Sequence, residues 1–328
     1  MVTRKEVAEL AGVSTATVSR VMSKSGYVSE AAKEKVERAI RHLNYIPNNL
    51  AKNLTQNKSN VVAVLVEDVT NPYYLQILES MSDEGRKYNL IISLFAVNKG
   101  DIDIILESLI KNRVCAIINL ALFSCSERYI SILNELDIYT INVRPRDQEA
   151  CLKLFLNQDR GIEEMFSVLK SKGRRKLVYI ASLNKEIASE DIRLSAYRKN
   201  CQKYGFVQDP QYIIFGDYPE RRAFEVGYDS AELLLKQKLD FDSVFCLNDS
   251  TAMGVMKCLL SHGVRIPQDV CVVGCDNIIL SQYVQPSLST IDVQTERQGK
   301  AYIRAVVAKI VDGAEEIDAK LICRESIG

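Results

Sequence analysis

The chain contains 328 residues, of which 47% are apolar, and this length and composition support two or three globular domains. No apolar run approaches the roughly 18 residues needed to span a membrane, and charged residues throughout positions 1–10 argue against a signal peptide, so we expect a cytoplasmic protein. The 42 basic and 42 acidic residues cancel, which over the whole chain would argue against a nucleic-acid partner.

The charges are nevertheless unevenly distributed. Residues 1–58 contain ten Lys and Arg against five Asp and Glu, a net charge of +5, whereas residues 59–328 carry a net charge of −5. A basic head on an acidic body is typical of a DNA-binding arm attached to a globular domain. We interpret the acidic body itself as an ordinary solvated surface.

Nine cysteines favour a reducing compartment over a disulfide-bonded protein. Their number is odd, none forms a Cys-x-x-Cys pair and most lie in apolar runs, so we interpret them as small buried hydrophobic residues. Cys271 and Cys275 are the pair that a metal would use, but neither His42 nor His262 is near them in sequence. We therefore predict no metal site.

The first elements are two short helices around one turn, within residues 3–22. Thr3 followed by Glu6 forms a capping box, and Gly12 suits the left-handed end of the first helix. Ser14 then caps the second helix. The apolar residues predicted to face inward are Val7, Leu10, Ala11, Val18, Val21 and Met22. Helix, glycine turn and capped helix together are the helix-turn-helix signature.

The outer side of the second helix carries short polar residues and one arginine, which suits contact with base edges in a DNA major groove. These residues are Thr15, Ala16, Thr17, Ser19 and Arg20. A helical hairpin that only packs against its neighbours is the alternative.

A third helix is predicted from Glu30, with Ser29 as its cap, to about Asn44. Its basic residues combine solubility with attraction to phosphate; they are Lys33, Lys35, Arg38 and Arg41. Pro47 ends this three-helix unit. The segment 48–56 suits a helix of about nine residues, which is too short to be stable alone in water. It is either a plain linker or a helix that folds when two copies meet on DNA.

From Val61 onward, short apolar runs alternate with helical stretches. About ten strands are predicted, including runs at 61–66, 90–97, 116–121, 138–143, 152–156, 177–181, 212–215, 244–247 and 270–274. Helical stretches between them include 73–88, 162–172, 193–204, 222–235 and 251–262. Uniformly apolar strands joined by helices indicate an α/β fold with doubly wound parallel sheets, and this many strands suit two lobes better than one.

Polar residues that end these strands are candidate ligand groups, because ligands of such sheets lie at the carboxyl ends of strands or in an interlobe cleft. Each alone is also a common helix cap or turn residue, and we expect Asp249 to cap the helix that follows it. Together they suit a polyhydroxylated ligand. They include Glu67, Asp68, Tyr73, Tyr74, Asn98, Asn142, Asp159, Arg193, Asp217, Tyr218, Asn248, Asp276 and Asn277. No glycine-rich phosphate loop or Ser/His/Asp arrangement is present, so we predict neither a cofactor nor an enzyme.

These motifs resemble the lactose-repressor (LacI/GalR) family of transcriptional regulators over nearly the whole chain. The segments VAELAGVSTATVSRVM, YVSE and LNYIPNNLAKNL match the head and hinge of the family. The regulatory core is matched, in order, by DVTNPYY, the Gly-Asp pair at 216–217, LNDSTAMGV, IPQDVCVVGCDN, PSLSTI and CRES.

The resemblance implies a helix-turn-helix DNA-binding domain at 1–47, a hinge helix and linker at 48–58, and an effector-binding and dimerisation core at 59–328. The core would be two-lobed, like periplasmic sugar-binding proteins, and crossed near residues 160, 290 and 321. The N-lobe would span about 60–160 plus 291–321, and the C-lobe about 161–290 plus 322–328.

The resemblance also implies roles for single residues. Thr15, Ala16 and Arg20 would contact the bases. Ser14, Thr17 and Tyr45 would contact the DNA backbone. The hinge residues expected at DNA are Asn48, Lys52 and Leu54. Of these, Leu54 matches a leucine wedged into the minor groove, and Lys52 replaces a common arginine. Effector positions are Tyr73, Tyr74, Asp159, Arg193, Tyr218, Asn248 and Asp276. The chain departs from the family at Ala196, where glycine is usual, and at Cys275, where an aromatic residue is common.

The resemblance therefore predicts a sequence-specific transcriptional regulator, most often a repressor in this family, that binds a palindromic operator as a homodimer. We expect a dimer because the chain stops just after CRES, without the tail that makes some members tetramers. A sugar, sugar phosphate or nucleoside in the cleft would change operator affinity, as inducer or as co-repressor. The alternatives are a sugar-binding protein without a transcriptional role and a sugar-modifying enzyme.

Overall fold

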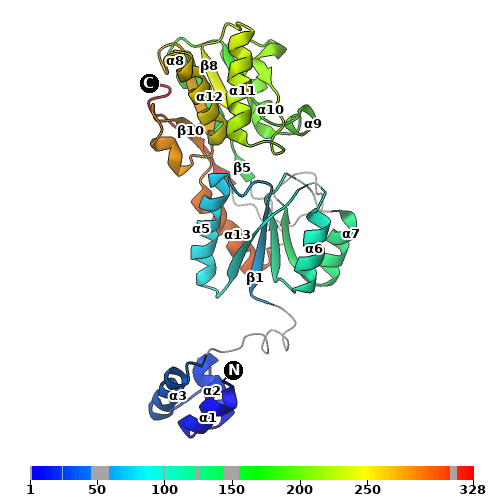
Figure 1. Cartoon of the computed structure of the whole chain (residues 1–328), viewed down its shortest axis with the longest axis vertical. Coiled ribbons are helices and arrows are strands. Elements are labelled where there is room, and N and C mark those ends of the chain that lie inside the picture. The colour runs from blue at the N-terminus through cyan, green and yellow to red at the C-terminus, as the bar shows by residue number, and fades with distance from the viewer. Residues whose placement is uncertain are drawn as a thin grey trace. The chain divides into compact units, whose positions relative to one another are not determined.

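The computed structural model describes residues 2–23, 25–45, 59–98, 100–122, 126–142, 155–310 and 316–328 (Figure 1). The chain divides into two compact units, Met1–Ser59 and Asn60–Gly328. The predicted hinge helix, with Asn48, Lys52 and Leu54, lies outside the described residues. Within them, no helix is long and apolar enough to cross a bilayer.

The first unit consists of α1 (Arg4–Ala11), α2 (Thr15–Ser23) and α3 (Glu30–His42). The capping box is present, because Thr3 Oγ1 accepts from the Glu6 N–H at 3.3 Å and the Glu6 carboxylate accepts from the Thr3 N–H at 2.6 Å. Gly12 ends α1 in the left-handed region, with φ of 65°. The buried core comprises Val7, Ala8, Ala11, Val18, Val36, Ala39 and Tyr45.

The prediction that Leu10 faces the core of the bundle is wrong, because its side chain is 52% exposed. The bundle buries Val7, Ala8 and Ala11 instead. Residues 7, 8 and 11 lie on one face of a helix with 3.6 residues per turn, whereas residue 10 points away from residue 8. The third helix also ends two residues earlier than predicted, at His42.

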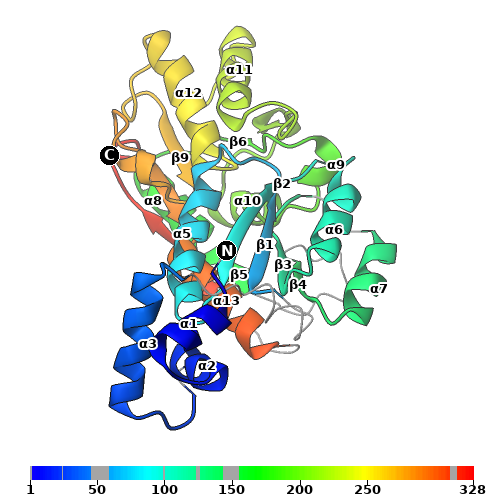
Figure 2. The ribbon, with the colours of Figure 1, turned by 60° about the horizontal axis from the view of Figure 1, so that its bottom comes forward.

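The second unit begins with a four-stranded parallel sheet in the order β2-β1-β3-β4 (Figure 2). Its strands are β1 (Val61–Val66), β2 (Ile91–Ala96), β3 (Ala116–Asn119) and β4 (Tyr139–Asn142). Alternate residues of β1 enter different apolar layers. Val62 and Val64 pack toward α5 (Pro72–Arg86), whereas Ala63 and Leu65 pack toward α6 (Ile102–Lys111) and α7 (Glu127–Glu135). The sheet is therefore covered on both faces, as its apolar strands predict.

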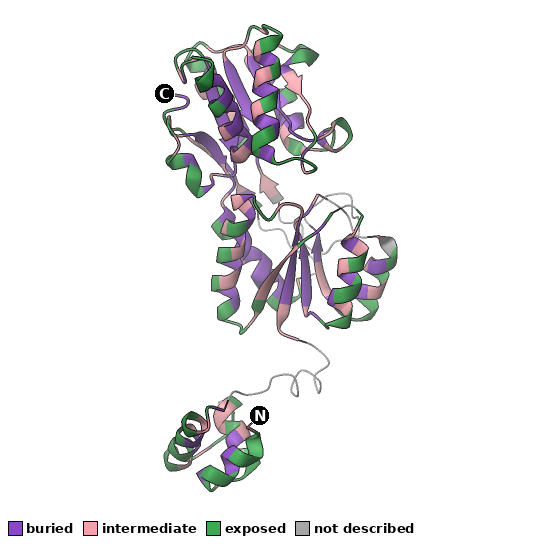
Figure 3. Ribbon diagram, viewed as in Figure 1, coloured by how far each residue is buried: buried purple, intermediate pink, exposed green. Residues whose placement is uncertain are grey.

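The second unit also contains a six-stranded sheet in the order β12-β10-β9-β8-β6-β7. Its strands are β6 (Leu177–Ile180), β7 (Ile213–Ile214), β8 (Ser243–Cys246), β9 (Cys271–Cys275), β10 (Ser289–Asp292) and β12 (Lys320–Ile322). All neighbours are parallel except β10 and β12. Figure 3 shows the inner strands buried beneath helices whose outer faces are exposed. These helices and turns are α8 (Asp159–Ser171), α9 (Lys185–Ala188), α10 (Ile192–Tyr204), η1 (Pro210–Tyr212), α11 (Ala223–Lys236), α12 (Asp249–Ser261) and η2 (Ile279–Gln282).

The chain passes between the two sheets more than once. A short parallel pair joins β5 (Phe155–Asn157) to β11 (Glu316–Asp318), with Leu156 opposite Ile317. After β10 the chain forms α13 (Thr295–Ala308), which packs on α5 beside the four-stranded sheet, and it then returns through β11 to β12. The two sheets are thus linked by neighbouring segments from distant parts of the sequence.

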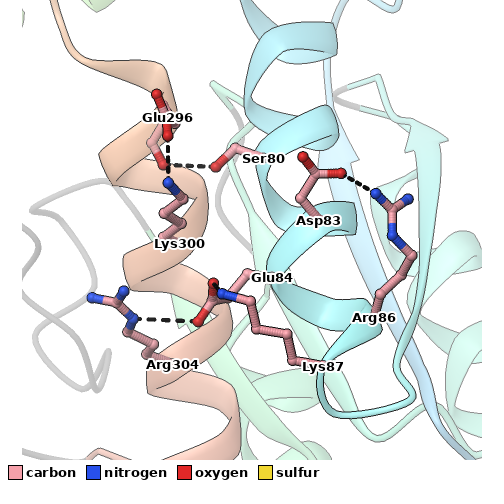
Figure 4. Close-up of polar contacts among 8 residues, drawn as sticks. All are labelled: Ser80, Asp83, Glu84, Arg86, Lys87, Glu296, Lys300 and Arg304. Atoms are coloured by element: carbon pink, nitrogen blue, oxygen red, sulfur yellow. Dashed lines mark hydrogen bonds and ion pairs between the residues drawn. The ribbon is translucent and has the colours of Figure 1, made fainter.

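Polar contacts fix α13 on α5 (Figure 4). The Glu84 carboxylate is buried, and it accepts from Lys87 Nζ at 2.6 Å and from Arg304 Nε at 3.4 Å. Ser80 Oγ donates to the Glu296 carbonyl at 2.6 Å. A Cβ at Gly299 would lie 2.7 Å from the Ile77 carbonyl oxygen, so glycine is what lets the two helices approach this closely.

The described cysteines are all free, and most are buried, as the composition predicts. Those buried are Cys201, Cys246, Cys258, Cys271 and Cys275, while Cys323 is exposed. The sequence does not predict β10, because Ser289, Thr290 and Asp292 are polar. The structure buries the first two by hydrogen-bonding their hydroxyls, for example Ser289 Oγ to the Arg324 carbonyl at 3.1 Å.

Candidate functional site

The first candidate surface is the outer face of α2. Thr15, Ala16 and Arg20 are all exposed there, while Val18 is fully buried on the opposite side and anchors the helix. The helix begins as predicted, with Ser14 Oγ accepting from the Thr17 N–H at 3.1 Å. The exposed face is free of acidic side chains, since α2 reads TATVSRVMS. Such a face can approach an anionic surface without charge repulsion.

The loop that follows α2 supports the base of the Arg20 side chain. A Cβ at Gly26 would lie 3.6 Å from Arg20 Cδ, and the φ of Gly26 is 70°. The loop thus passes beside the arginine stem at a residue that takes the left-handed region without strain. The stem is confined, while the side chain as a whole stays exposed.

The remaining predicted DNA residues of the head differ in exposure. Tyr45 is only 8% exposed and packs in the bundle core, so its ring has a structural role. Two basic residues of α3 pair with glutamates of the same helix, Lys33 with Glu30 at 3.5 Å and Arg38 with Glu34 at 3.7 Å. These exposed pairs indicate a solubility role more than attraction to phosphate.

The second candidate site lies where polar residues follow the strands of the two sheets. Glu67 comes directly after β1, and its Oε1 accepts from the Tyr74 hydroxyl at 2.6 Å and from the Tyr218 hydroxyl at 3.2 Å. Burial raises the pKa of Tyr74 and that of Tyr218 well above the ordinary value, so both hydroxyls keep their protons and donate. Tyr74 belongs to α5 and Tyr218 follows β7, so this contact joins the two lobes.

Arg193 is held by a residue that the sequence analysis missed. Its Nε and Nη2 donate to the two oxygens of Asp191 at 2.9 and 2.7 Å, and its Nη1 donates to the Leu247 carbonyl at 2.8 Å. Asp191 also caps α10 by accepting from the Arg193 N–H at 2.8 Å. An aspartate two residues before an arginine at a helix start is the signal that would have found this pair.

Asp276 and Tyr73 lie near this ion pair. Asp276 follows β9 and is 6% exposed, and burial raises the pKa of its carboxyl well above the ordinary value. Arg193 opposes that rise in pKa and the other carboxylates add to it. Tyr73 places its ring against Tyr74, with centroids 5.1 Å apart, and its hydroxyl donates to Gln298 Oε1 at 3.3 Å.

Two predicted effector residues have other partners. Asp159 is exposed at the start of α8, where its carboxylate pairs with Lys199 at 3.1 Å. Asn248 is buried, and its Oδ1 caps α12 by accepting from the Thr251 N–H at 2.8 Å. The structure therefore brings together Tyr73, Tyr74, Arg193, Tyr218 and Asp276, with Glu67 and Asp191 as additional members.

Asp249 does not cap α12, contrary to the sequence prediction, because Asn248 occupies that position. Its fully buried carboxylate instead accepts from the Ile278 N–H at 2.9 Å, from Ser281 Oγ at 2.6 Å and from Thr290 Oγ1 at 2.5 Å. Burial raises the pKa of Asp249 to about 7, although these hydrogen bonds oppose the rise. The residue ties α12 to β10 and η2.

Comparison with known proteins identifies relatives of both units. Residues 3–48 match the bacterial regulatory proteins of the lacI family, and residues 166–327 match a periplasmic binding protein-like domain. The HTH-type transcriptional repressor PurR of Vibrio atlanticus is 30% identical over 328 residues, which cover 96% of this chain and 94% of that protein. The ribose operon repressor of Escherichia coli is 31% identical, covering 94% of this chain and 93% of that protein.

Solved structures show the same fold. The Lac repressor dimer bound to operator and the anti-inducer ONPF superposes with a TM-score of 0.82 at 22% identity, covering 99% of each chain. A LacI family regulator from Enterococcus faecium with bound ribose has a TM-score of 0.70 at 20% identity, covering 81% of this chain and 98% of that one. Both units therefore have counterparts of known architecture.

Proposed function

The chain belongs to the lacI family of bacterial regulatory proteins, and we propose that it represses transcription by binding a palindromic operator as a homodimer. The observation that carries this proposal is the outer face of α2. Thr15, Ala16 and Arg20 stand clear of the bundle core there, on a helix that presents no acidic side chain. A helix of this kind fits a major groove.

In this proposal the three exposed residues of α2 read bases, and Arg20 donates to a guanine through its guanidinium. Ser14, Thr17 and Tyr45 contact the sugar-phosphate backbone. Asn48, Lys52 and Leu54, which lie outside the described residues, meet the minor groove at the operator centre, with Leu54 as the wedge that bends the duplex.

An exposed apolar surface supports the homodimer. Ile279 is 55% exposed and Tyr283 is 75% exposed, next to Leu280. Leu75 of α5 and Ile279 line one hollow of about 510 Å³, so the apolar side chains of the two segments are neighbours. Exposed apolar side chains gathered in one place mark interfaces more often than free surface. A second copy of the chain is the partner that a palindromic operator requires.

We further propose that the residue cluster around Glu67, Arg193 and Asp276 binds a small hydroxylated effector. The ribose bound to the Enterococcus faecium relative and the ribose repressors among the relatives support a sugar or a sugar derivative. An effector that favours one arrangement of the lobes would change the operator affinity of the dimer by linkage. We also propose that the protein acts in the cytoplasm, where its operator would be.

Electrophoretic mobility shift on randomised palindromic duplexes, with selection of the bound sequences, tests the repressor. We expect a two-fold symmetric consensus bound by two copies of the chain. Failure to select any duplex at low salt, with and without candidate sugars, would contradict a DNA-binding role. A sugar that binds while no duplex does would favour the alternative, a sugar-binding protein without a transcriptional role.

A further inference from the structure

A side chain of α5 holds the segment that follows β9. Gln76 Oε1 accepts from the Ile279 N–H at 2.8 Å. Gln76 Nε2 donates to the Asn277 carbonyl at 3.4 Å and to Thr295 Oγ1 at 3.3 Å. Because α5 packs beside the four-stranded sheet while β9 belongs to the six-stranded sheet, one amide group joins elements of different sheets.

The backbone of this segment is strained where it begins. Asp276 has a φ of 115° and Asn277 has a φ of 56°, a region that residues with a side chain rarely adopt. Such conformations persist only where the surrounding structure fixes them, and they gather at ligand sites and switches. The strained pair starts at a member of the candidate effector cluster, so that cluster and the contact with α5 lie three residues apart.

Other contacts of the segment come from the six-stranded sheet and its own helix. The Asn277 N–H donates to Thr290 Oγ1 at 3.2 Å, and Asn277 Oδ1 accepts from Arg324 Nη2 at 2.7 Å. The Ile278 N–H donates to the Asp249 carboxylate at 2.9 Å. These partners lie on β10, after β12 and at the start of α12, so their contacts move together with β9. The contact with α5 depends instead on how the two sheets are arranged.

The surface that we assign to the second copy has a part on each side of this contact. Leu75 directly precedes Gln76 on α5. The other part consists of Ile279, Leu280 and Tyr283, in and next to η2. Gln76 lines the same hollow of about 510 Å³ as Leu75 and Ile279. A surface built from two sheets' elements is continuous only in an arrangement that brings both parts together.

We propose that Gln76 is a positioning residue for dimerisation, which holds η2 against α5 and so makes the surface for the second copy depend on the arrangement of the two sheets. This role rests on the homodimer proposed above and names the side chain through which that arrangement controls it. The amide is suited to the role because its acceptor and its donors are all engaged, two of them by backbone groups of the segment.

Gln76→Met tests the role in the full chain, because methionine keeps an unbranched side chain of similar length and loses all three hydrogen bonds. We expect the dissociation constant of the homodimer, measured by sedimentation equilibrium, to rise about tenfold or more. Hydrogen–deuterium exchange of residues 277–283 should accelerate by a similar factor at concentrations that keep the protein dimeric. The thermal unfolding midpoint should stay close to that of the unchanged chain.

Gln282→Met is the matched control, since Gln282 is exposed and lines the same hollow. Its dimer affinity and its exchange should both stay unchanged. Thr295→Val removes one of the three hydrogen bonds and should change both measurements in the same direction as Gln76→Met, by a smaller factor.

Normal dimer affinity and normal exchange in Gln76→Met would overturn the positioning role. Faster exchange throughout the core, with a lowered unfolding midpoint, would also overturn it, because Gln76 would then only stabilise the fold. An unchanged chain that stays monomeric at all concentrations would contradict the homodimer itself. A normal dimer that is insensitive to Gln76→Met contradicts the role of Gln76 alone.

Discussion

At the scale of single residues, local chemistry decides whether a polar side chain is structural or available to a ligand. Asn248 and Asp249 are adjacent and both buried, yet the first satisfies the N–H groups at the start of α12 and the second accepts three hydrogen bonds from distant segments. Asp276, one strand away, has no such partners among the described residues. The same residue type therefore has a structural role at 249 and a candidate binding role at 276.

Arg20→Ala should relax sequence preference at one operator position. A guanidinium on a guanine is worth about 1–3 kcal/mol, so affinity for the best operator should fall roughly 5- to 150-fold while non-specific affinity changes little. Fluorescence anisotropy on matched and scrambled duplexes measures both. Arg38→Ala is the control, because that exposed arginine pairs with Glu34. Equal weakening on all duplexes would make Arg20 a phosphate contact.

Asp249 should make stability depend on pH. Its pKa is about 7 in the folded chain and near 3.8 when free, so the folded state binds the proton more tightly. Stability from this group is fully present below pH 3.8 and is lost as pH rises through 7. Relative to Asp249→Asn, the free energy of unfolding should fall by about 2–3 kcal/mol between pH 5 and pH 8. Urea denaturation followed by circular dichroism measures it. A constant difference would show that Asp249 is ionised throughout.

At the scale of elements, glycines set how closely helices approach. α11 and α12 cross at Gly227 and Gly254, where an added Cβ would lie 2.1 Å from the Thr251 carbonyl oxygen and 2.0 Å from that of Phe224. Backbone atoms cannot move aside as flexible side chains can, so the two helices would have to separate. Helix existence is thus predictable from local periodicity, whereas helix spacing depends on residues that only the packed structure identifies.

Gly254→Ala should therefore destabilise the core by about 3 kcal/mol or more, since overpacking against backbone cannot relax locally. The urea midpoint of the circular dichroism transition measures this loss. Gly100→Ala is the control, because no atom lies within 4 Å of a Cβ at that position. A Gly254→Ala variant as stable as the control would mean that α11 and α12 are able to shift apart freely.

At the scale of the whole molecule, the proposed activity requires two copies. The exposed apolar side chains of Leu75, Ile279, Leu280 and Tyr283 form the surface that we assign to the second copy. A charge in such an interface leaves an unpaired carboxylate buried, which costs several kcal/mol. Operator affinity should then fall, because two half-sites are bound tightly only by two linked heads.

Ile279→Glu should shift the protein to monomer in sedimentation velocity and weaken operator binding at least a hundredfold. Ile104→Glu is the control, because Ile104 is a more exposed isoleucine on α6, away from this surface. It should leave both measurements unchanged. A dimer that persists in Ile279→Glu, with normal operator affinity, would place the dimer interface elsewhere.

Sequence alone determined what depends on neighbours along the chain. The capping box at Thr3, the left-handed Gly12 and the uniformly apolar run of β1 are all present where they were predicted, because caps, turns and strand periodicity are local. The head, the α/β core and the family follow from such signals. Polar strands such as β10 were not predicted from the sequence, because their burial depends on hydrogen-bond partners elsewhere in the fold.

Only the tertiary structure decided which strand-end residues meet. Glu67 and Tyr218 are 151 residues apart and share a hydrogen bond, while Asp159 pairs with Lys199, which is 40 residues further along the chain. These pairings depend on how two sheets are connected and closed, and residue spacing carries no information about that. Which polar groups meet at the candidate effector site is therefore a property of the folded molecule.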